Sequence, residues 1–229
     1  ILYYYCVISF PPNGGCDSLT SNIVAVEVVD NVSIDTDPLS ETICVGGIAN
    51  ELIITHSGGT GNVSYLWYSN TIASNSGGTP IGGATTINFT PPASTFTNAG
   101  EYYYYVEVEV DGSGCSPVSS AVATITVVDG PTVSIAPTAD QVLCQDAAAN
   151  ALTVTASDGN GTVYNYQWYS NDTNDTVTPT AIGTDSDTYT PLTDTVGTLY
   201  YYCIVTQPFS GCEATTQLVS VTVNQGPSF

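Results

Sequence analysis

The sequence predicts an all-β protein, built as a tandem array of β-sandwich modules of about 100 residues. A tyrosine-rich segment is written three times, beginning at Tyr3, Tyr103 and Tyr200, and a Gly-Cys pair follows each copy. Runs of tyrosine and β-branched residues next to a glycine-containing turn are typical of a strand that opens a hairpin. Finally, about seven short apolar stretches per module, separated by Gly, Pro and Asn turns, show no helical period.

The interval between the copies is the size of a whole domain. Trp67 and Trp168 lie 101 residues apart, and Cys44 and Cys144 lie 100 apart. A repeat of this length carries its own hydrophobic core, unlike the roughly 20–50-residue units of solenoids. We therefore divide the chain into residues 1–30, the C-terminal hairpin of a truncated module; residues 31–130 and 131–224, two complete modules; and residues 225–229, the start of the next module.

The connections between these modules are very short. They are Asp129-Gly130-Pro131 and Gln225-Gly226-Pro227. Because short proline-containing linkers resist bending, we expect a stiff rod of modules.

Alternation along the tyrosine strand, expected at residues 101–110 and 199–206, fixes which side chains face inward. The acids Glu107 and Glu109 then fall on the solvent face. The tryptophans lie in the middle of the central strands, expected at 63–69 and 164–170. The predicted inward residues are Trp67, Tyr104, Val106, Val108 and Val110 in one module, and Trp168, Leu199, Tyr201, Cys203 and Val205 in the other; Tyr103, Tyr105, Tyr200, Tyr202 and Ile204 are predicted to face outward.

The composition is acidic and almost without cations. The chain has no Lys or Arg, 21 Asp and Glu, one His and a net charge of −21 at pH 7. Nothing in it neutralises phosphate, which excludes nucleic acid and polybasic attachment to anionic lipid. No apolar run approaches the roughly 18 residues that span a membrane. Most of the charge repulsion is screened at physiological salt, and this composition favours an extracellular setting.

The last module resembles the immunoglobulin pattern. Asp194-Thr195-Val196 leads to Tyr201-Tyr202-Cys203, and Trp168 lies about 35 residues upstream of that cysteine. A core tryptophan followed by a Tyr-x-Cys strand is similar to immunoglobulin domains, and the resemblance implies immunoglobulin-like β-sandwiches.

The middle module carries five further motifs: Cys-x-Gly at 44–46, Gly-Gly-x-Gly at 58–61, Tyr-x-Trp-Tyr-Ser at 65–69, Gly-Gly-Thr-Pro-Ile-x-Gly-Ala-Thr at 77–85 and Thr-Pro-Pro at 90–92. Together they resemble the Ig-like repeats of giant Bacteroidetes cell-surface adhesins, the SprB-type gliding motility adhesins. The last module departs from the pattern at Gln145-Asp146 and at residues 176–183. The resemblance implies type IX secretion and a role in gliding or surface attachment.

Seven cysteines, five of them recurring at two module positions, indicate disulfides formed in an oxidising compartment. Because residues 31–130 contain only Cys44 and Cys115, we expect these two to pair, and by analogy Cys144 to pair with Cys212. Such a loop of ~70 residues stabilises a module by roughly 4 kcal/mol in the chain-entropy model. The sequence does not show that Cys44, several residues before its strand, reaches its partner.

The remaining cysteines leave an alternative open. In the first pairing Cys6 and Cys203 are free and buried, and the partner of Cys16 lies before residue 1. The rival pairing closes the hairpins locally, as Cys6–Cys16 and Cys203–Cys212, and leaves Cys144 alone.

No constellation indicates catalysis, and we predict that the chain is not an enzyme. The only histidine is His56, expected at the surface or facing a loop at the end of a strand. Nucleophile–base chemistry requires a unique set of groups, which a chain of repeats does not offer.

Calcium is the one candidate cofactor. Carboxylates and amides cluster in expected loops at Asp35 and Asp37, at Asp185 and Asp187, and at residues 171–175. These are the hard oxygen ligands that calcium prefers. None has the spacing of a known calcium loop or recurs in register, so solvated turns are the simpler interpretation and no bound cofactor is predicted.

Two kinds of surface site remain as candidates. Outward tyrosines with Trp67, Trp168, Tyr68 and Tyr169 would form a carbohydrate platform, but the mid-strand tryptophans favour a core role. Three Asp-Ser/Thr-aliphatic sequences resemble O-glycosylation sites of Bacteroidetes; the candidate acceptors are Ser18, Thr176 and Thr195.

We interpret the chain as a non-catalytic stalk segment of a large secreted cell-surface adhesin. Its expected partners are neighbouring modules of the same chain, with surface polysaccharide or gliding-machinery proteins as further candidates. The alternatives are an accessory carbohydrate-binding or spacer array on a secreted polysaccharide-degrading enzyme, and a surface-layer or filament subunit.

Overall fold

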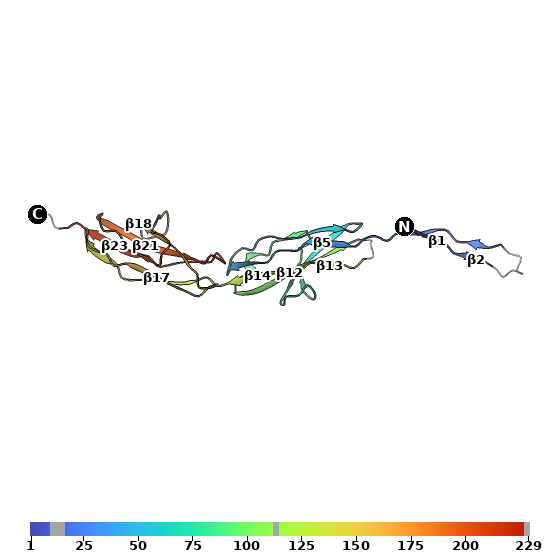
Figure 1. The fold of residues 1–229 in the computed structure, drawn as a ribbon, viewed down its shortest axis with the longest axis horizontal. Helices are drawn as coiled ribbons and strands as arrows, with labels where there is room; N and C mark the ends of the chain where they lie inside the picture. Colours follow the sequence, from blue (N-terminus) through green and yellow to red (C-terminus); the bar gives the residue numbers. More distant parts are fainter. Residues whose placement is uncertain (10–16, 112–114, 227–229) are drawn as a thin grey trace.

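The computed structural model describes residues 1–9, 17–111 and 115–226, mostly as strands joined by turns. Figure 1 shows two bodies that lie end to end and a narrow hairpin that extends beyond the first of them. We call residues 1–30 the N-terminal hairpin, residues 31–130 the middle module and residues 131–224 the C-terminal module. Residues 10–16, which include Cys16, lie outside the described residues.

The N-terminal hairpin is built from two strand pairs. β1 (Leu2–Tyr4) pairs antiparallel with β4 (Val24–Val26), and β2 (Val7–Ile8) with β3 (Leu19–Thr20). Every residue of these four strands is exposed. Within the described residues, this segment therefore has no buried core.

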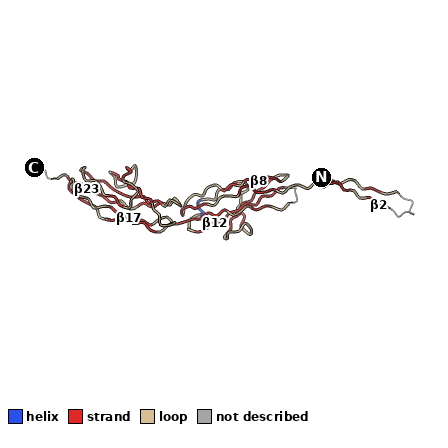
Figure 2. Tube along the Cα trace, viewed as in Figure 1, coloured by secondary structure: helices blue, strands red, loops and turns tan. Residues whose placement is uncertain are grey.

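The middle module is a two-layered sandwich. Its larger sheet has the order β10-β9-β12-β14-β6, with β13 beside β12. These strands are β6 (Glu41–Cys44), β9 (Val63–Asn70), β10 (Thr79–Pro80), β12 (Gly100–Val110), β13 (Val118–Ser119) and β14 (Ala123–Val128). The facing layer pairs β5 (Val32–Thr36) with β8 (Thr55–Gly58), and β7 (Leu52–Ile53) with β11 (Asn88–Phe89). A short 3-10 turn, η1 (Ala93–Thr95), is the one helical segment within the described residues (Figure 2).

The C-terminal module repeats this arrangement. Its larger sheet has the order β16-β23-β21-β18-β19, with β22 beside β21, and its facing sheet has the order β15-β17-β20. These strands are β15 (Thr132–Ala136), β16 (Gln141–Cys144), β17 (Leu152–Ser157), β18 (Asn165–Asn171), β19 (Thr180–Ile182), β20 (Thr188–Tyr189), β21 (Gly197–Thr206), β22 (Glu213–Thr215) and β23 (Val219–Asn224). The predicted all-β tandem sandwich is confirmed.

Strand registers show that the two modules are structural copies. Trp67 lies opposite Val106 in the β9–β12 pair, and Trp168 lies opposite Cys203 in the β18–β21 pair. In each module one strand runs parallel to the last strand: Cys44 is opposite Val128, and Cys144 is opposite Asn224. Residues at the same register position are therefore equivalent.

Each tryptophan is the centre of its module's core. Trp67 and Trp168 are both 0% exposed, as predicted for core residues. The indole nitrogen of Trp67 donates to the Thr86 carbonyl oxygen at 2.9 Å, and that of Trp168 donates to the Ser186 carbonyl oxygen at 2.8 Å. These bonds satisfy the one polar atom of each ring, so burial carries no unpaired donor.

The predicted inward face of the tyrosine strand is largely confirmed. The residues expected inside that are buried are Tyr104, Val106, Val108, Val110, Tyr201, Cys203 and Val205. The expectation was wrong for two outward tyrosines, because Tyr105 and Tyr202 are also buried. Tyr105 stacks on Tyr68 with ring centroids 4.9 Å apart, and its hydroxyl accepts a bond from the Gly78 backbone N–H. The outer face is therefore packed beneath the loop that carries Gly78.

Leu199 is a second correction, because it is 40% exposed rather than inside. The backbone carbonyl of Phe96 accepts from Gly46 in the middle module, and that of Thr193 accepts from Asp146 in the C-terminal module. Phe96 is fully buried, but its counterpart Thr193 is too small to fill the same space. A hollow of about 540 Å³ in the C-terminal module is lined by Leu199 and by Leu192 and Asp194, the neighbours of Thr193 in sequence.

Replacing Trp67 by alanine is expected to destabilise the middle module by about 3–5 kcal/mol, because a fully buried aromatic ring leaves a cavity. Calorimetry would resolve the lowered transition of this module. Trp168 fluorescence would show that the C-terminal module still folds. Ile72→Ala, at an exposed position, is the control and should change the unfolding free energy little. A middle-module transition unmoved by the Trp67 substitution would contradict the central role of this ring.

The raised pKa values of two core tyrosines predict that the free energy of unfolding falls at alkaline pH. Burial raises the pKa of both Tyr104 and Tyr201 to about 12, above the value near 10 of a free tyrosine. Their contribution is fully present below about pH 10 and is lost as pH rises toward 12. In urea titrations, a Tyr104→Phe/Tyr201→Phe variant should lose less stability over this window than the unchanged protein. Tyr5→Phe, at an exposed position, is the control, and equal losses in all three proteins would exclude these rings as the cause.

Candidate functional site: the joint between the modules

The most informative site is a disulfide that joins the two modules. Cys44 is bonded to Cys212, with their Cα atoms 5.5 Å apart and 168 residues between them in sequence. We call the end of a module where the chain enters its leading end, and the end where the chain leaves its trailing end. Cys44 lies beside Val128 at the trailing end of the middle module. Cys212 lies at the leading end of the C-terminal module, beside linker residue Gly130.

A glycine turn fixes Cys44 at the trailing end. The Val45 N–H donates to the Val128 carbonyl at 2.9 Å, which continues the parallel pairing of β6 and β14 past the cysteine. The Gly47 N–H then donates to the Cys44 carbonyl at 2.8 Å. Gly46 has a φ of +76°, in the left-handed region that glycine adopts without strain. The sequence Cys-Val-Gly-Gly therefore ends the strand with its sulfur at the joint.

A buried glutamine fixes Cys212 at the leading end. Gln207 is 0% exposed, and its backbone N–H donates to the Cys212 carbonyl at 2.8 Å. Its side-chain oxygen accepts from the Asn160 N–H at 2.9 Å, and its side-chain nitrogen donates to the carbonyls of Asp158 and Gly161. All polar groups of the amide are thus used to tie the cysteine loop to the neighbouring 158–161 loop. Such a satisfied buried network holds its members in one arrangement.

The linker between the modules is short and packed. β14 ends at Val128 and β15 begins at Thr132, which leaves three connecting residues. Pro131 is buried, and the space beside Gly130 is occupied by Cys212 and by the backbone of Glu213. The joint is therefore held by a peptide connection and a disulfide side by side, and it resists bending in the plane of these two links.

The predicted pairing of the cysteines was wrong. Cys115 belongs to the leading end of the middle module, where the Asn31 side chain donates to the neighbouring Ser116 carbonyl. Cys44 belongs to the opposite end, and a disulfide needs Cα atoms within about 7 Å. Cys44 and Cys115 are thus too far apart to pair. Cys212 does not pair with Cys144, because it is already bonded to Cys44.

The rival hairpin pairing was wrong as well for Cys212. Cys203 is a buried free thiol, as expected, and burial raises its pKa to about 11. Cys6 is free but exposed rather than buried, as is every residue of the four strands of the N-terminal hairpin. Cys144 is free and exposed at the trailing end of the C-terminal module.

The loop carboxylates serve as hydrogen-bond acceptors. Asp35 accepts from Ser57, Asp37 from the Ala121 N–H at 2.7 Å, and Asp185 from the Tyr166 N–H at 2.7 Å. Asp187 offers its backbone carbonyl to Val154. Within the described ranges, no three His, Cys, Asp or Glu side chains come together in a group suited to a metal ion.

Asp140 of the C-terminal module is the counterpart of Asp37 in the middle module, an equivalence that the sequence did not lead us to expect. Asp37 accepts from Ala121, and Asp140 accepts from the Ser220 N–H at 3.1 Å. Hydrogen bonds from Ser220 lower the pKa of Asp140. The signal was the recurrence of an aspartate shortly before strands β6 and β16.

His56 is half-buried rather than exposed. Its Nε2 atom is 2.6 Å from the Tyr65 hydroxyl oxygen, and its ring lies against the Tyr65 ring. Its Nδ1 atom is buried with no hydrogen-bond partner in the described part of the chain. The histidine thus lies on β8 and packs against Tyr65 of β9.

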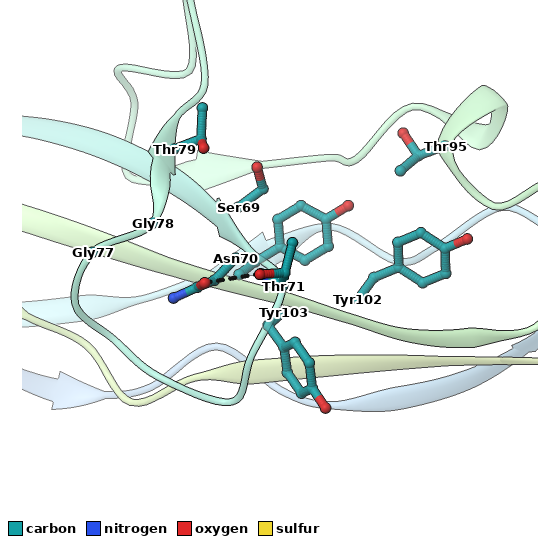
Figure 3. Close-up of a pocket in the computed structure, with 10 residues that line it drawn as sticks. Ser69, Asn70, Thr71, Gly77, Gly78, Thr79, Thr95, Tyr102 and Tyr103 are labelled. Carbon is teal, nitrogen blue, oxygen red and sulfur yellow. Dashed lines mark hydrogen bonds between the residues drawn. The ribbon is translucent and has the colours of Figure 1, made fainter.

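The two kinds of surface candidate differ in their exposure. The tryptophans of the candidate sugar platform are buried and inaccessible. Figure 3 shows a hollow of about 280 Å³ that is lined by Tyr102, Tyr103 and Tyr104 together with small polar residues and glycines. Ser18, Thr176 and Thr195 are all exposed, so a glycosylating enzyme has access to each of these residues.

Peptide mapping under non-reducing conditions should recover Cys44 linked to Cys212. Chymotryptic cleavage after Phe209 separates Cys212 from Cys203, so the two are distinguished by mass.

The bridge should stabilise the two-module unit by at most about 5 kcal/mol in the chain-entropy model. Cys44→Ser should widen the range of inter-module angles in solution X-ray scattering, whereas Cys203→Val should not. A recovered Cys44–Cys115 peptide would contradict the joint.

Comparisons with known proteins give the family. Among the described residues, no helix has the length and apolar character to cross a membrane. No curated protein matches the chain. Solved structures with similar folds include fibronectin(III)-like modules of Clostridium thermocellum CbhA (18% identity, TM-score 0.45, covering 85% of this chain and 95% of that one). Drosophila OTK extracellular domains 3–5 also match (14% identity, TM-score 0.44, 97% and 70% covered). A family model described as a domain of unknown function, DUF8696, matches residues 36–129 and 133–225, so this chain belongs to the DUF8696 family and carries two of its domains in tandem.

Proposed function

We propose that this chain is a non-catalytic stalk segment of a large secreted adhesin, in which tandem modules transmit tension along a rod. The observation that carries the proposal is the disulfide between Cys44 and Cys212 at the joint of two modules stacked end to end. A bridge within one module would stabilise that module. A bridge between modules instead makes the joint itself covalent at two points.

The position of the bridge determines which residues carry a pulling force. Cys44 ends β6, the second strand of the middle module, and Cys212 precedes β22 and β23, the last strands of the C-terminal module. A pull on the two chain ends therefore passes from residue 44 to residue 212 across the sulfur atoms. Of the two modules, only residues 32–44 and 212–224 lie on this path. Both tryptophan cores are inside the closed loop and are shielded from complete extension.

The composition agrees with a secreted stalk. A structural disulfide requires an oxidising environment, which is typical of the extracellular space. The absence of Lys and Arg removes every trypsin-type cleavage site. The high density of acids keeps neighbouring rods apart at short range, because like charges repel within a Debye length of about 8 Å.

The resemblance to SprB-type repeats extends the proposal to gliding or attachment at the cell surface, after type IX secretion. The motifs at residues 65–69 and 77–85 support this extension. In the structure they form strand β9 and the loop that covers Tyr105. An accessory carbohydrate-binding array is less well supported, because both tryptophans of the candidate sugar platform are buried.

Single-molecule pulling on the two ends of the chain tests the stalk mechanism. Full extension of the 168 residues between the bridged cysteines would add about 60 nm, at roughly 3.5 Å per residue. In the oxidised protein the disulfide should prevent this extension, so that the two modules add only about 10 nm to the length of the chain. A Cys44→Ser/Cys212→Ser variant should release the whole length.

Cys203→Val is the matched control, since it removes a buried cysteine outside the joint. Valine occupies the same position in the middle module, at Val106. This variant should behave as the unchanged protein does. Equal extension of the oxidised protein and the double variant would overturn the proposed mechanism.

A further inference from the structure

The setting of Cys144 is a structural copy of the setting of Cys44. Cys144 ends β16 as Cys44 ends β6, each on a strand parallel to the last strand of its module. The Gln145 N–H donates to the Asn224 carbonyl at 2.8 Å, matching the bond of Val45 to Val128 at 2.9 Å. The Ala147 N–H donates back to the Cys144 carbonyl at 3.1 Å, as Gly47 does to Cys44.

The left-handed residue of the turn is also retained. Asp146 has a φ of +64° at the position of Gly46, and its N–H donates to the Thr193 carbonyl at 2.9 Å. A non-glycine residue adopts this conformation at some cost in free energy. The turn is thus held in the shape that presents the cysteine, although its sequence differs from the Cys-Val-Gly-Gly of the middle module.

The two cysteines differ in what lies opposite them. Cys44 faces the leading end of a second module and is bonded to it, whereas Cys144 is exposed as a free thiol. The chain beyond β23 begins with the same kind of linker, since Gln225-Gly226-Pro227 corresponds to Asp129-Gly130-Pro131 in sequence. In the observed joint, the Gly-Pro linker holds the leading end of the C-terminal module against the trailing end of the middle module.

We infer that Cys144 forms a disulfide with the leading-end cysteine of a further DUF8696 module, the counterpart of Cys212. The two thiols lose two protons and two electrons to a disulfide oxidant, which is itself reduced to two thiols. The new S–S bond repeats the one already present between the middle and C-terminal modules. The inference rests on the geometry of the joint and does not require the proposed role in adhesion.

The consequence is a chain with overlapping covalent links. Cys144 lies inside the loop that Cys44 and Cys212 close. A bridge from Cys144 to the next module would therefore begin before the first bridge ends in sequence. The C-terminal module would thus take part in both bridges. Neither bridge would allow the residues between its two cysteines to be extended fully while it was intact.

The test adds a second copy of residues 131–224, carrying Cys144→Ser, after residue 226 of the chain. The added copy supplies a leading-end cysteine beside the original Cys144 and contributes no second Cys144 peptide. After oxidation with glutathione disulfide, chymotryptic mapping should recover Cys144 linked to the Cys212 of the added copy. Labelling of Cys144 by a maleimide should fall from near completion in the 229-residue chain to below about a tenth in the extended chain, because the maleimide reacts only with a free thiol.

The matched control is the extended chain with serine in place of the added copy's Cys212, in which Cys144 should label fully. Trp fluorescence of both extended chains should show the same folded modules. Full labelling of Cys144 in the oxidised extended chain would overturn the inference. So would bonding of Cys144 to Cys6 or to Cys144 of a second chain, seen as a dimer on a non-reducing gel.

Discussion

The antiparallel pairing of the tryptophan strand with the tyrosine strand is the interaction on which each module depends. In this pairing Trp67 is set opposite Val106 and Trp168 opposite Cys203, at the middle of the larger sheet. The next strand, β14 or β23, adds to the tyrosine strand and aligns β6 or β16 in parallel beside it. The cysteine that ends β6 therefore owes its position at the trailing end to a register set in the centre of the core.

The joint uses this arrangement to connect two independent cores. The core residues of the middle module and of the C-terminal module form separate clusters, so each module buries its own apolar surface. Without a shared core, a short linker alone would allow the modules to bend relative to each other. The disulfide between Cys44 and Cys212 supplies the second connection. Rigidity at the joint thus comes from covalent geometry and not from a large apolar interface.

Because the chain has no Lys or Arg to pair with, several carboxylates accept hydrogen bonds from backbone N–H groups. Asp37 and Asp140 each accept from a backbone N–H more than 75 residues away, which closes the sandwich across its edge. Glu41 accepts from the Asn50 N–H at 2.7 Å, and the neutral Gln141 accepts from the Asn150 N–H at 2.8 Å. Because an amide replaces an acid at the same place, the essential property there is an oxygen acceptor and not a charge.

The sequence by itself determined what repeats along the chain. The hundred-residue period, the sandwich class and the inward face at Tyr104 and Tyr201 follow from alternation and spacing, which are local properties. The partners of the cysteines and the burial of Tyr105 were decided only by the tertiary structure. Sequence equivalence shows that Cys44 and Cys144 occupy the same place, but not which module end lies opposite that place. That choice depends on how two folded bodies meet across a three-residue linker, and the meeting surfaces exist only after both cores have formed.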